Sequence, residues 1–315
     1  MSDVINQIRR EIAKVVVGQE SMIDGLLIGL LCDGHILIEG IPGLAKTTTV
    51  KALSQSLGLG FKRVQFTPDL LPSDILGAEV YDPQNNGFKI KKGPIFTNLL
   101  LADEINRAPA KVQSALLEVM AERQVTLGDE SFRLASPFLV MATQNPIENE
   151  GVYPLPEAQL DRFMLKINVG YNTPDEELSI ARRISSGGAE SIDAVITSDA
   201  LLQLKEKVKS VHIDEPVEKY MIDLVTATRE PERFALEEIK KYLQFGASPR
   251  VSIDMFKASR AVAFLRGREF VNPSDVISIA KELMRHRLVL SYEGEAEGIT
   301  TDELIEKIIK VVPVP

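Results

Sequence analysis

The chain has 315 residues, of which 44% are hydrophobic and 26% charged, with a net charge of -9. This length suits one large or two medium-sized domains; the acidic balance disfavours nucleic acid as a partner, and the apolar runs are too short for an integral membrane protein. Cys32 is the single cysteine, which excludes an internal disulfide, and the charged N-terminus does not resemble a signal peptide, so we expect a cytoplasmic protein.

The first half of the chain alternates between strand and helix patterns. Short apolar runs predict buried strands at Ile36–Glu39, Lys62–Phe66, Thr97–Leu101, Phe138–Ala142 and Phe163–Val169. Helices are predicted near Lys46–Leu57 and Lys111–Arg123. This alternation predicts a mainly parallel sheet with helices on both faces. Ligands of such sheets bind beyond the carboxyl ends of the strands.

Two segments interrupt this alternation. Glu79–Lys92 alternates around the turn sequence Pro83-Gln84-Asn85-Asn86-Gly87, and Gln124–Leu134 does so around Gly128-Asp129-Glu130. Both patterns predict β-hairpins. They are either surface decorations or projections that contact a substrate or a neighbouring subunit.

After residue 172 the strand patterns end. Amphipathic helical patterns follow at Asp175–Arg183, Ala200–Val211, Val217–Thr228, Val251–Leu265 and Val276–Leu290. We therefore predict an α/β fold in which residues 1–172 form a parallel-sheet core with β-hairpin inserts. Residues 173–315 are predicted to form an all-α domain behind it.

The turn between the first strand and the first helix has the composition of a phosphate loop. Gly40–Thr47 fits the pattern G-x-x-x-x-G-K-[ST] except that Ala45 stands in place of the second glycine. The glycines allow backbone N–H groups to surround an anion, and the following helix directs its positive end at it. Lys46 would reach the β- and γ-phosphates of ATP, and the Thr47 hydroxyl would bind Mg²⁺. The predicted nucleotide site comprises Gly40, Pro42, Gly43, Leu44, Ala45, Lys46, Thr47 and Thr48.

Polar groups follow two further strands. Leu99–Ala102 is an apolar run that delivers Asp103 and Glu104 at its end. Asp103 would hold Mg²⁺ directly or through water, while Glu104 would polarise the attacking water. Asn145, after the strand Phe138–Ala142, is either a γ-phosphate contact or part of a simple Asn-Pro turn.

Two arginines complete an ordered set of candidate catalytic residues. Arg162 precedes the last strand, and Arg250 follows Ser248 and Pro249, which predict an N-cap and a first helical residue. Each arginine alone would be interpreted as a surface charge. Their order after the phosphate loop and the carboxylate pair is what makes them candidates.

The whole set resembles the AAA+ ATPases, and more closely the MoxR family. The matching stretches are Gly18-Gln19-Glu20, Gly40–Thr47, Asp103–Pro109, Gln113–Thr126, Thr143–Pro146, Leu155–Phe163, Gly246–Arg250 and His286-Arg287. The resemblance covers nearly the whole chain and implies a P-loop AAA+ core followed by an all-α lid domain. MoxR proteins usually carry alanine at the position of Ala45.

The resemblance also implies roles for individual residues. Asn145 matches sensor 1, Arg162 the arginine finger for a neighbouring subunit, and Arg250 sensor 2, acting in its own subunit or across the interface. Val17 and Gly18 match the loop beside the adenine. The family implies a ring, with six subunits expected, and chaperone-like action on protein clients, often with partners that carry von Willebrand factor A domains.

Three functions remain open at this point. The first is a ring-forming ATPase that remodels or matures a protein partner. The second is the motor subunit of a metal chelatase, because MoxR proteins resemble magnesium chelatase ATPases. The third is a switch that binds ATP but barely hydrolyses it, and Glu104 argues against it because a pure switch does not need that carboxylate. A GTPase is disfavoured by the absence of an Asn-Lys-x-Asp segment.

Overall fold

The computed structural model describes residues 2–146, 151–187 and 190–315. The chain forms two compact units. The core unit comprises Asp3–Leu155 and Ile167–Leu202, and the lid unit comprises Pro156–Lys166 and Gln203–Pro315. This division by contacts differs from a single cut at residue 172, which stays a prediction about the domain limits.

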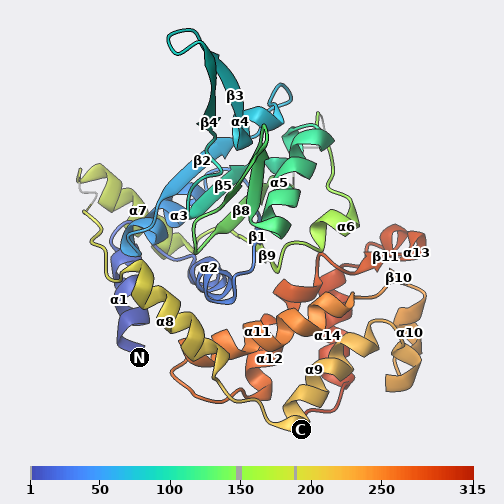
Figure 1. Ribbon diagram of the computed structural model, residues 1–315. Helices are drawn as coiled ribbons and strands as arrows, with labels where there is room; N and C mark the ends of the chain where they lie inside the picture. Colours follow the sequence, from blue (N-terminus) through green and yellow to red (C-terminus); the bar gives the residue numbers. More distant parts are fainter. Residues whose placement is uncertain (1, 147–150, 188–189) are drawn as a thin grey trace. The chain divides into compact units, whose positions relative to one another are not determined.

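Five parallel strands form the sheet of the core (Figure 1). They are β1 (Ile36–Glu39), β2 (Phe61–Gln65), β5 (Leu99–Asp103), β8 (Leu139–Gln144) and β9 (Leu165–Asn168), in the order β2-β5-β8-β1-β9. This confirms the predicted parallel sheet. Leu99–Ala102 is fully buried, because both faces of a parallel sheet are covered and its strands are apolar throughout.

The core unit also contains helices. They are α1 (Ser2–Ala13), α2 (Glu20–Cys32), α3 (Lys46–Ser56), α5 (Ala110–Glu122) and α7 (Pro174–Ser185), with a 3-10 turn η1 (Ile105–Arg107) after β5. The connection from β1 to β2 runs across the sheet in the opposite direction to that from β5 to β8. Because such crossovers are right-handed, α3 and α5 lie on opposite faces. The sheet is thus enclosed between two helical layers.

Both predicted hairpins are present. The first, β3 (Gly77–Asp82) with β4 (Gly87–Lys92), follows α4 (Pro72–Leu76) and projects beyond the sheet (Figure 1, top). The second pairs β6 (Gln124–Leu127) with β7 (Glu130–Arg133). Gly77 closes the base of the first hairpin with a φ of 100°, and a Cβ there would lie 2.2 Å from Lys91 O. No other residue fits that crossing without moving the backbone.

The two hairpins are joined near their bases. Lys92 Nζ lies 4.9 Å from the ring centroid of Phe96 and 4.4 Å from that of Phe132, and the two rings meet edge to face. Phe132 belongs to the second hairpin and Lys92 to the first. The Lys92–Phe132 cation–π contact therefore joins the two hairpins, and Phe96, which follows the first hairpin, packs edge to face against Phe132.

The lid unit is helical, as predicted. It contains α6 (Glu157–Leu160), α9 (Glu215–Ala227), η2 (Pro231–Phe234), α10 (Glu237–Lys240), α11 (Pro249–Leu265), α12 (Pro273–Met284), α13 (Tyr292–Ala296) and α14 (Thr301–Val311), and α8 (Ser198–Lys209) leads into it. It also contains two short strands, β10 (Leu243–Phe245) and β11 (Val289–Leu290).

One predicted lid helix is therefore too long. The helix expected at Val276–Leu290 ends at Met284, because Val289 and Leu290 pair with β10 instead. The apolar pattern was continuous across this point, so only the tertiary pairing separates the helix from the strand. Among the described residues, no helix combines the length and the apolar character needed to cross a bilayer.

Buried His35 makes the stability of the core pH-dependent. Its Nδ1 accepts from the Val140 N–H at 2.9 Å and its Nε2 donates to Met120 O at 3.1 Å, a pairing that requires the neutral ring. Burial lowers the pKa of His35 from its usual 6.5 to about 4. Because the unfolded chain binds this proton more readily, the stabilisation present above pH 6.5 is lost as the pH falls towards 4.

We predict that this loss amounts to up to about 3 kcal/mol of unfolding free energy. His35→Gln should flatten the decline between pH 6.5 and 4. His212→Gln is the matched control, since His212 is largely exposed and should leave the decline unchanged. Urea unfolding of the three proteins at several pH values measures the slopes, and identical slopes would contradict the assignment.

Candidate functional site

The phosphate loop lies between β1 and α3, at the carboxyl edge of the sheet. The Gly40 N–H donates to Gln144 O on β8 at 3.3 Å, which ties the start of the loop to the sheet. Gly43 has a φ of 88° and Ala45 a φ of 55°, so the backbone enters the left-handed region twice before α3 begins at Lys46. Alanine adopts this conformation at a cost of about 1 kcal/mol, so the surrounding structure enforces the turn.

One cleft collects most of the residues predicted to bind nucleotide. It is lined by Pro42, Gly43, Leu44, Ala45, Lys46, Thr47, Thr48, Arg63, Asp103, Glu104 and Asn145. Lys46 Nζ donates to Gly40 O at 2.5 Å. Burial lowers the pKa of Lys46, while the carboxylates of Asp103 and Glu104 act in the opposite direction. Cationic, acidic and hydroxyl groups share this cleft, as binding of a phosphate chain with a metal ion requires.

The Asp103 carboxylate is held on both of its oxygens. Thr143 Oγ1 donates to Oδ1 at 2.5 Å, and Arg63 donates to Oδ2 from Nε at 2.9 Å and from Nη2 at 2.7 Å. Thr143 Oγ1 also accepts from the Glu104 N–H at 2.8 Å. One hydroxyl on β8 therefore holds the Asp103 carboxylate and the Glu104 backbone at the end of β5.

Glu104 stands at a strained turn directly after β5. Its φ is 56°, a left-handed value that non-glycine residues seldom adopt. Its carboxylate accepts from Gln65 Nε2 at 2.7 Å and pairs with Arg107 Nε at 3.0 Å. Gln65 Oε1 in turn accepts from Arg63 at 2.9 Å. Strain that the surrounding contacts enforce at a strand end is typical of functional positions.

Sequence reasoning missed four residues of this network: Arg63, Gln65, Arg107 and Thr143. The signal for two of them was present, because Arg63 and Gln65 are two apart on a strand and so share a face. The sequence does not state that the strand carrying Arg63 and Gln65 pairs with the strand carrying Asp103. Gln65 is opposite Asp103 only because β2 lies beside β5 in this register.

Asn145 follows β8 directly, is 7% exposed and lines the same cleft. The adenine-side prediction concerns Val17 and Gly18, which do not line it. Val17 O accepts from Asn172 Nδ2 at 2.9 Å, and a Cβ on Gly18 would lie 2.6 Å from the Glu176 carboxylate. The loop is thus packed against the start of α7.

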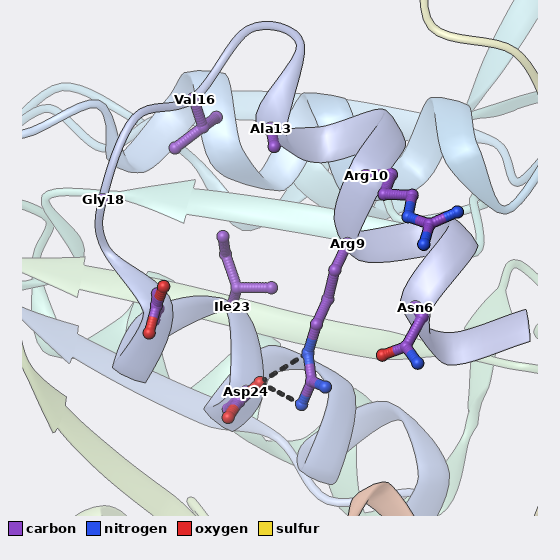
Figure 2. Close-up of a pocket in the computed structure, with 9 residues that line it drawn as sticks. Asn6, Arg9, Arg10, Ala13, Val16, Gly18, Ile23 and Asp24 are labelled. Atoms are coloured by element: carbon purple, nitrogen blue, oxygen red, sulfur yellow. Dashed lines mark hydrogen bonds and ion pairs between the residues drawn. The ribbon is translucent and has the colours of Figure 1, made fainter. Parts of the chain in front are cut away.

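Gly18 lines a second cleft, between α1 and α2. Figure 2 shows Arg9 reaching from α1 to Asp24 on α2, with distances of 3.1 and 2.7 Å from its nitrogens to Oδ1. Arg10 and Asn6 line the same cleft. The Arg9–Asp24 pair fastens the first helix to the second beside the Val17–Gly18 loop.

Arg162 and Arg250 belong to the lid unit rather than to the core unit that contains the phosphate loop. Arg162 lies between α6 and β9, next to Asp161. Arg250 is the second residue of α11 and donates to Asp161 Oδ2 at 3.2 Å. The predicted start of this helix at Ser248 and Pro249 is present, but the Ser248 hydroxyl donates to Asp161 rather than capping its own helix.

The donor set suits magnesium. The Thr47 hydroxyl and the Asp103 carboxylate line one cleft, and both offer the oxygen ligands that Mg²⁺ prefers. In the part of the chain that the structure describes, no group of three His, Cys, Asp or Glu residues could hold a metal ion alone.

The fold and the cleft together define a P-loop ATPase core with a helical lid. The model of the AAA family, "ATPase family associated with various cellular activities", matches residues 35–165, and the AAA lid domain matches residues 236–308. These two matches place the chain in the AAA class of ATPases.

Relatives at higher similarity define the family. The chain is 47% identical to the chaperone MoxR1 of Mycobacterium tuberculosis, over 97% of this chain and 81% of that protein. It is 33% identical to the MoxR protein of Paracoccus denitrificans, over 96% and 93%. A crystal structure of a candidate ATPase from Cytophaga hutchinsonii superposes with a TM-score of 0.95 at 48% identity, covering 100% of this chain and 96% of that one. The chain belongs to the MoxR family of AAA ATPases, and it is an ATPase.

Glu104→Gln separates nucleotide binding from hydrolysis. The amide keeps the size of the side chain but cannot accept a proton, so we expect ATP affinity within a few-fold of the parent and hydrolysis slower by about 10² or more. Titration with a fluorescent ATP analogue and phosphate release measure the two quantities. Glu118→Gln, exposed on α5, is the matched control and should leave both unchanged. Hydrolysis at the parent rate in Glu104→Gln would remove Glu104 from the mechanism.

Proposed function

We propose that the chain hydrolyses Mg·ATP in a closed homo-oligomeric ring and uses the energy to remodel or mature protein partners. The observation that carries the nucleotide part is the shared cleft of Lys46, Thr47, Asp103 and Glu104. Bound Mg²⁺ would neutralise charge on the phosphate oxygens, with Thr47 and Asp103 as its protein ligands. The ring is supported by family membership, with six subunits expected.

The residues of the cleft divide the chemistry among them. Lys46 and the N–H groups at the start of α3 bind and orient the β- and γ-phosphates. Glu104 polarises the attacking water and takes its proton, while Gln65 and Arg107 fix the position of its carboxylate. Asn145 contacts the γ-phosphate or the same water. Val17 and Gly18 form the adenine side of the site.

A cation from a second subunit completes the site in this proposal. Negative charge develops on the γ-phosphate oxygens, and Lys46 is the one cation of the segment Gly40–Thr48. Arg162 would supply the missing positive charge to the neighbouring subunit's nucleotide. A head-to-tail interface of this kind closes into a ring. Arg250 would contact nucleotide from the lid.

The first hairpin supports the chaperone-like part of the proposal. Tyr81 and Phe88 are directly opposed in its register, stack edge to face at 5.5 Å, and are 53% and 70% exposed. Exposed aromatic pairs on a projecting hairpin are suited to contact a protein partner. The MoxR1 relative is a chaperone, and the family resemblance adds partners with von Willebrand factor A domains. A cytoplasmic location belongs to the same proposal.

The shared site predicts complementation between two inactive variants. Arg162→Ala should bind ATP normally and hydrolyse it poorly, and Lys46→Ala should not bind it. A mixture of the two should recover activity, because an intact loop can then face an intact finger. The ATPase rates of each variant and of the mixture are measured against protein concentration to test this complementation. Full activity of Arg162→Ala alone would exclude the shared site.

The hairpin proposal is tested by replacing its aromatic pair. Tyr81→Ser with Phe88→Ser should leave basal ATPase unchanged, since neither residue lines the phosphate cleft. Protection of a thermally aggregating reporter enzyme, followed by light scattering, should be lost. Phe245→Ser removes a comparably exposed aromatic from the lid and is the control. Undiminished protection by the double variant would exclude this pair from client contact.

A further inference from the structure

The segment that carries Arg162 is fastened to the end of a lid helix. Three consecutive residues that follow α12 donate to backbone carbonyls of the segment that carries Arg162. Arg285 Nη1 donates to Lys166 O at 3.2 Å, His286 Nε2 to Phe163 O at 2.8 Å, and Arg287 Nη2 to Asp161 O at 3.1 Å. All three side chains are buried or nearly so, and burial keeps the pKa of His286 well below its usual value. Residues 156–166 therefore belong to the lid unit, although Leu165 and Lys166 are already the first two residues of β9.

The Asp161 carboxylate joins this segment to a second lid helix. Ser248 Oγ donates to it at 3.0 and 3.2 Å, and Arg250 Nη1 donates at 3.2 Å. Arg287 Nε lies 3.0 Å from Asp161 Oδ1, and this guanidinium is 2% exposed. Asp161 is therefore contacted by a buried cation and a hydroxyl, and also by Arg250, which is 59% exposed.

This arrangement links the two arginines that the proposed function uses. Arg162 directly follows Asp161, and Arg250 lies two residues after Ser248 on the rigid start of α11. Through Asp161, a movement of α11 would therefore displace the backbone that carries Arg162. Arg250, which is 59% exposed, would exchange the Asp161 carboxylate for a phosphate, while Ser248 and Arg287 still hold Asp161.

We propose that Asp161 is a positioning residue that makes Arg162 and Arg250 move as one body. The nucleotide sensed through Arg250 then sets the position of Arg162 presented to the next subunit. The inference rests on the proposed function for the roles of the two arginines, but the mechanical link itself does not depend on them.

The link is tested with Asp161→Asn in the Glu104→Gln background, which retains ATP. Hydrogen exchange of residues 156–166 and 246–252 is measured with and without ATP. We expect the ATP-dependent change to occur in both segments of the parent and to be confined to 246–252 in Asp161→Asn. Asp254→Asn is the matched control, because Asp254 pairs with the same Arg287 at 2.7 Å and has similar exposure. A coupled change that persists in Asp161→Asn would overturn the proposal.

The consequence for catalysis is tested by mixing. Asp161→Asn should hydrolyse ATP about 10- to 100-fold more slowly, as expected for a displaced catalytic group, with nucleotide affinity retained. Addition of Lys46→Ala, which supplies intact fingers, should restore activity, whereas addition of Arg162→Ala should not. A protein that merely misfolds would not be restored by either. Restoration by Arg162→Ala would place the defect of Asp161→Asn in its own phosphate site and overturn the inference. Arg162→Ala alone could be fully active while ATP still changes hydrogen exchange in both segments of the parent and in only one segment of Asp161→Asn. The shared-site function then fails, and the link through Asp161 stands.

Discussion

Parallel pairing of β5 with its neighbours is the constraint on which the nucleotide cleft depends. Parallel strands place their carboxyl ends at one edge of the sheet. The strand pairing therefore brings together the phosphate loop after β1, the carboxylates at the end of β5 and Asn145 after β8. The Thr143 hydroxyl then converts this proximity into a fixed geometry through hydrogen bonds to Asp103 and to the Glu104 N–H. Loss of the β5–β8 register would move Asp103 and Glu104 away from both the phosphate loop and Asn145.

The edge of the sheet is also where the backbone is strained. Ala45 and Glu104 both have left-handed φ values, and both line the same cleft. Each such residue costs on the order of 1–3 kcal/mol, which the buried sheet beneath must offset. The fully buried run Leu99–Ala102 is well suited to this, because it anchors the turn at Glu104 on a rigid strand.

The lid is organised by buried ion pairs rather than by apolar packing alone. Asp161 forms an ion pair with Arg287 and accepts a hydrogen bond from Ser248. Asp275, which is fully buried, is paired with Arg266 and Arg268. Removing one partner of a buried pair leaves an uncompensated charge, so these contacts resist gradual deformation. These contacts join distant segments of the lid unit to one another.

Local residue patterns alone determined the class of fold and singled out the residues that line the phosphate cleft. The apolar strand runs, the glycine-rich turn before Lys46 and the carboxylates after Leu99–Ala102 are all local features that chain order preserves. Hairpins could be predicted for the same reason, since turn residues and alternation lie within one short segment. The lid was predicted as helical because amphipathic periodicity is also local.

Tertiary structure decided everything that depends on pairing between distant segments. Arg63 and Gln65 reach the carboxylates because β2 adds to the edge of the sheet beside β5, and no local pattern states which strands are neighbours. Val289 and Leu290 form a strand because they pair with β10. Asp161 joined Ser248 and Arg287, which are 87 and 126 residues away along the chain. Contacts at such separations are set by the packing of whole elements, and the periodicity of any one segment carries no record of them.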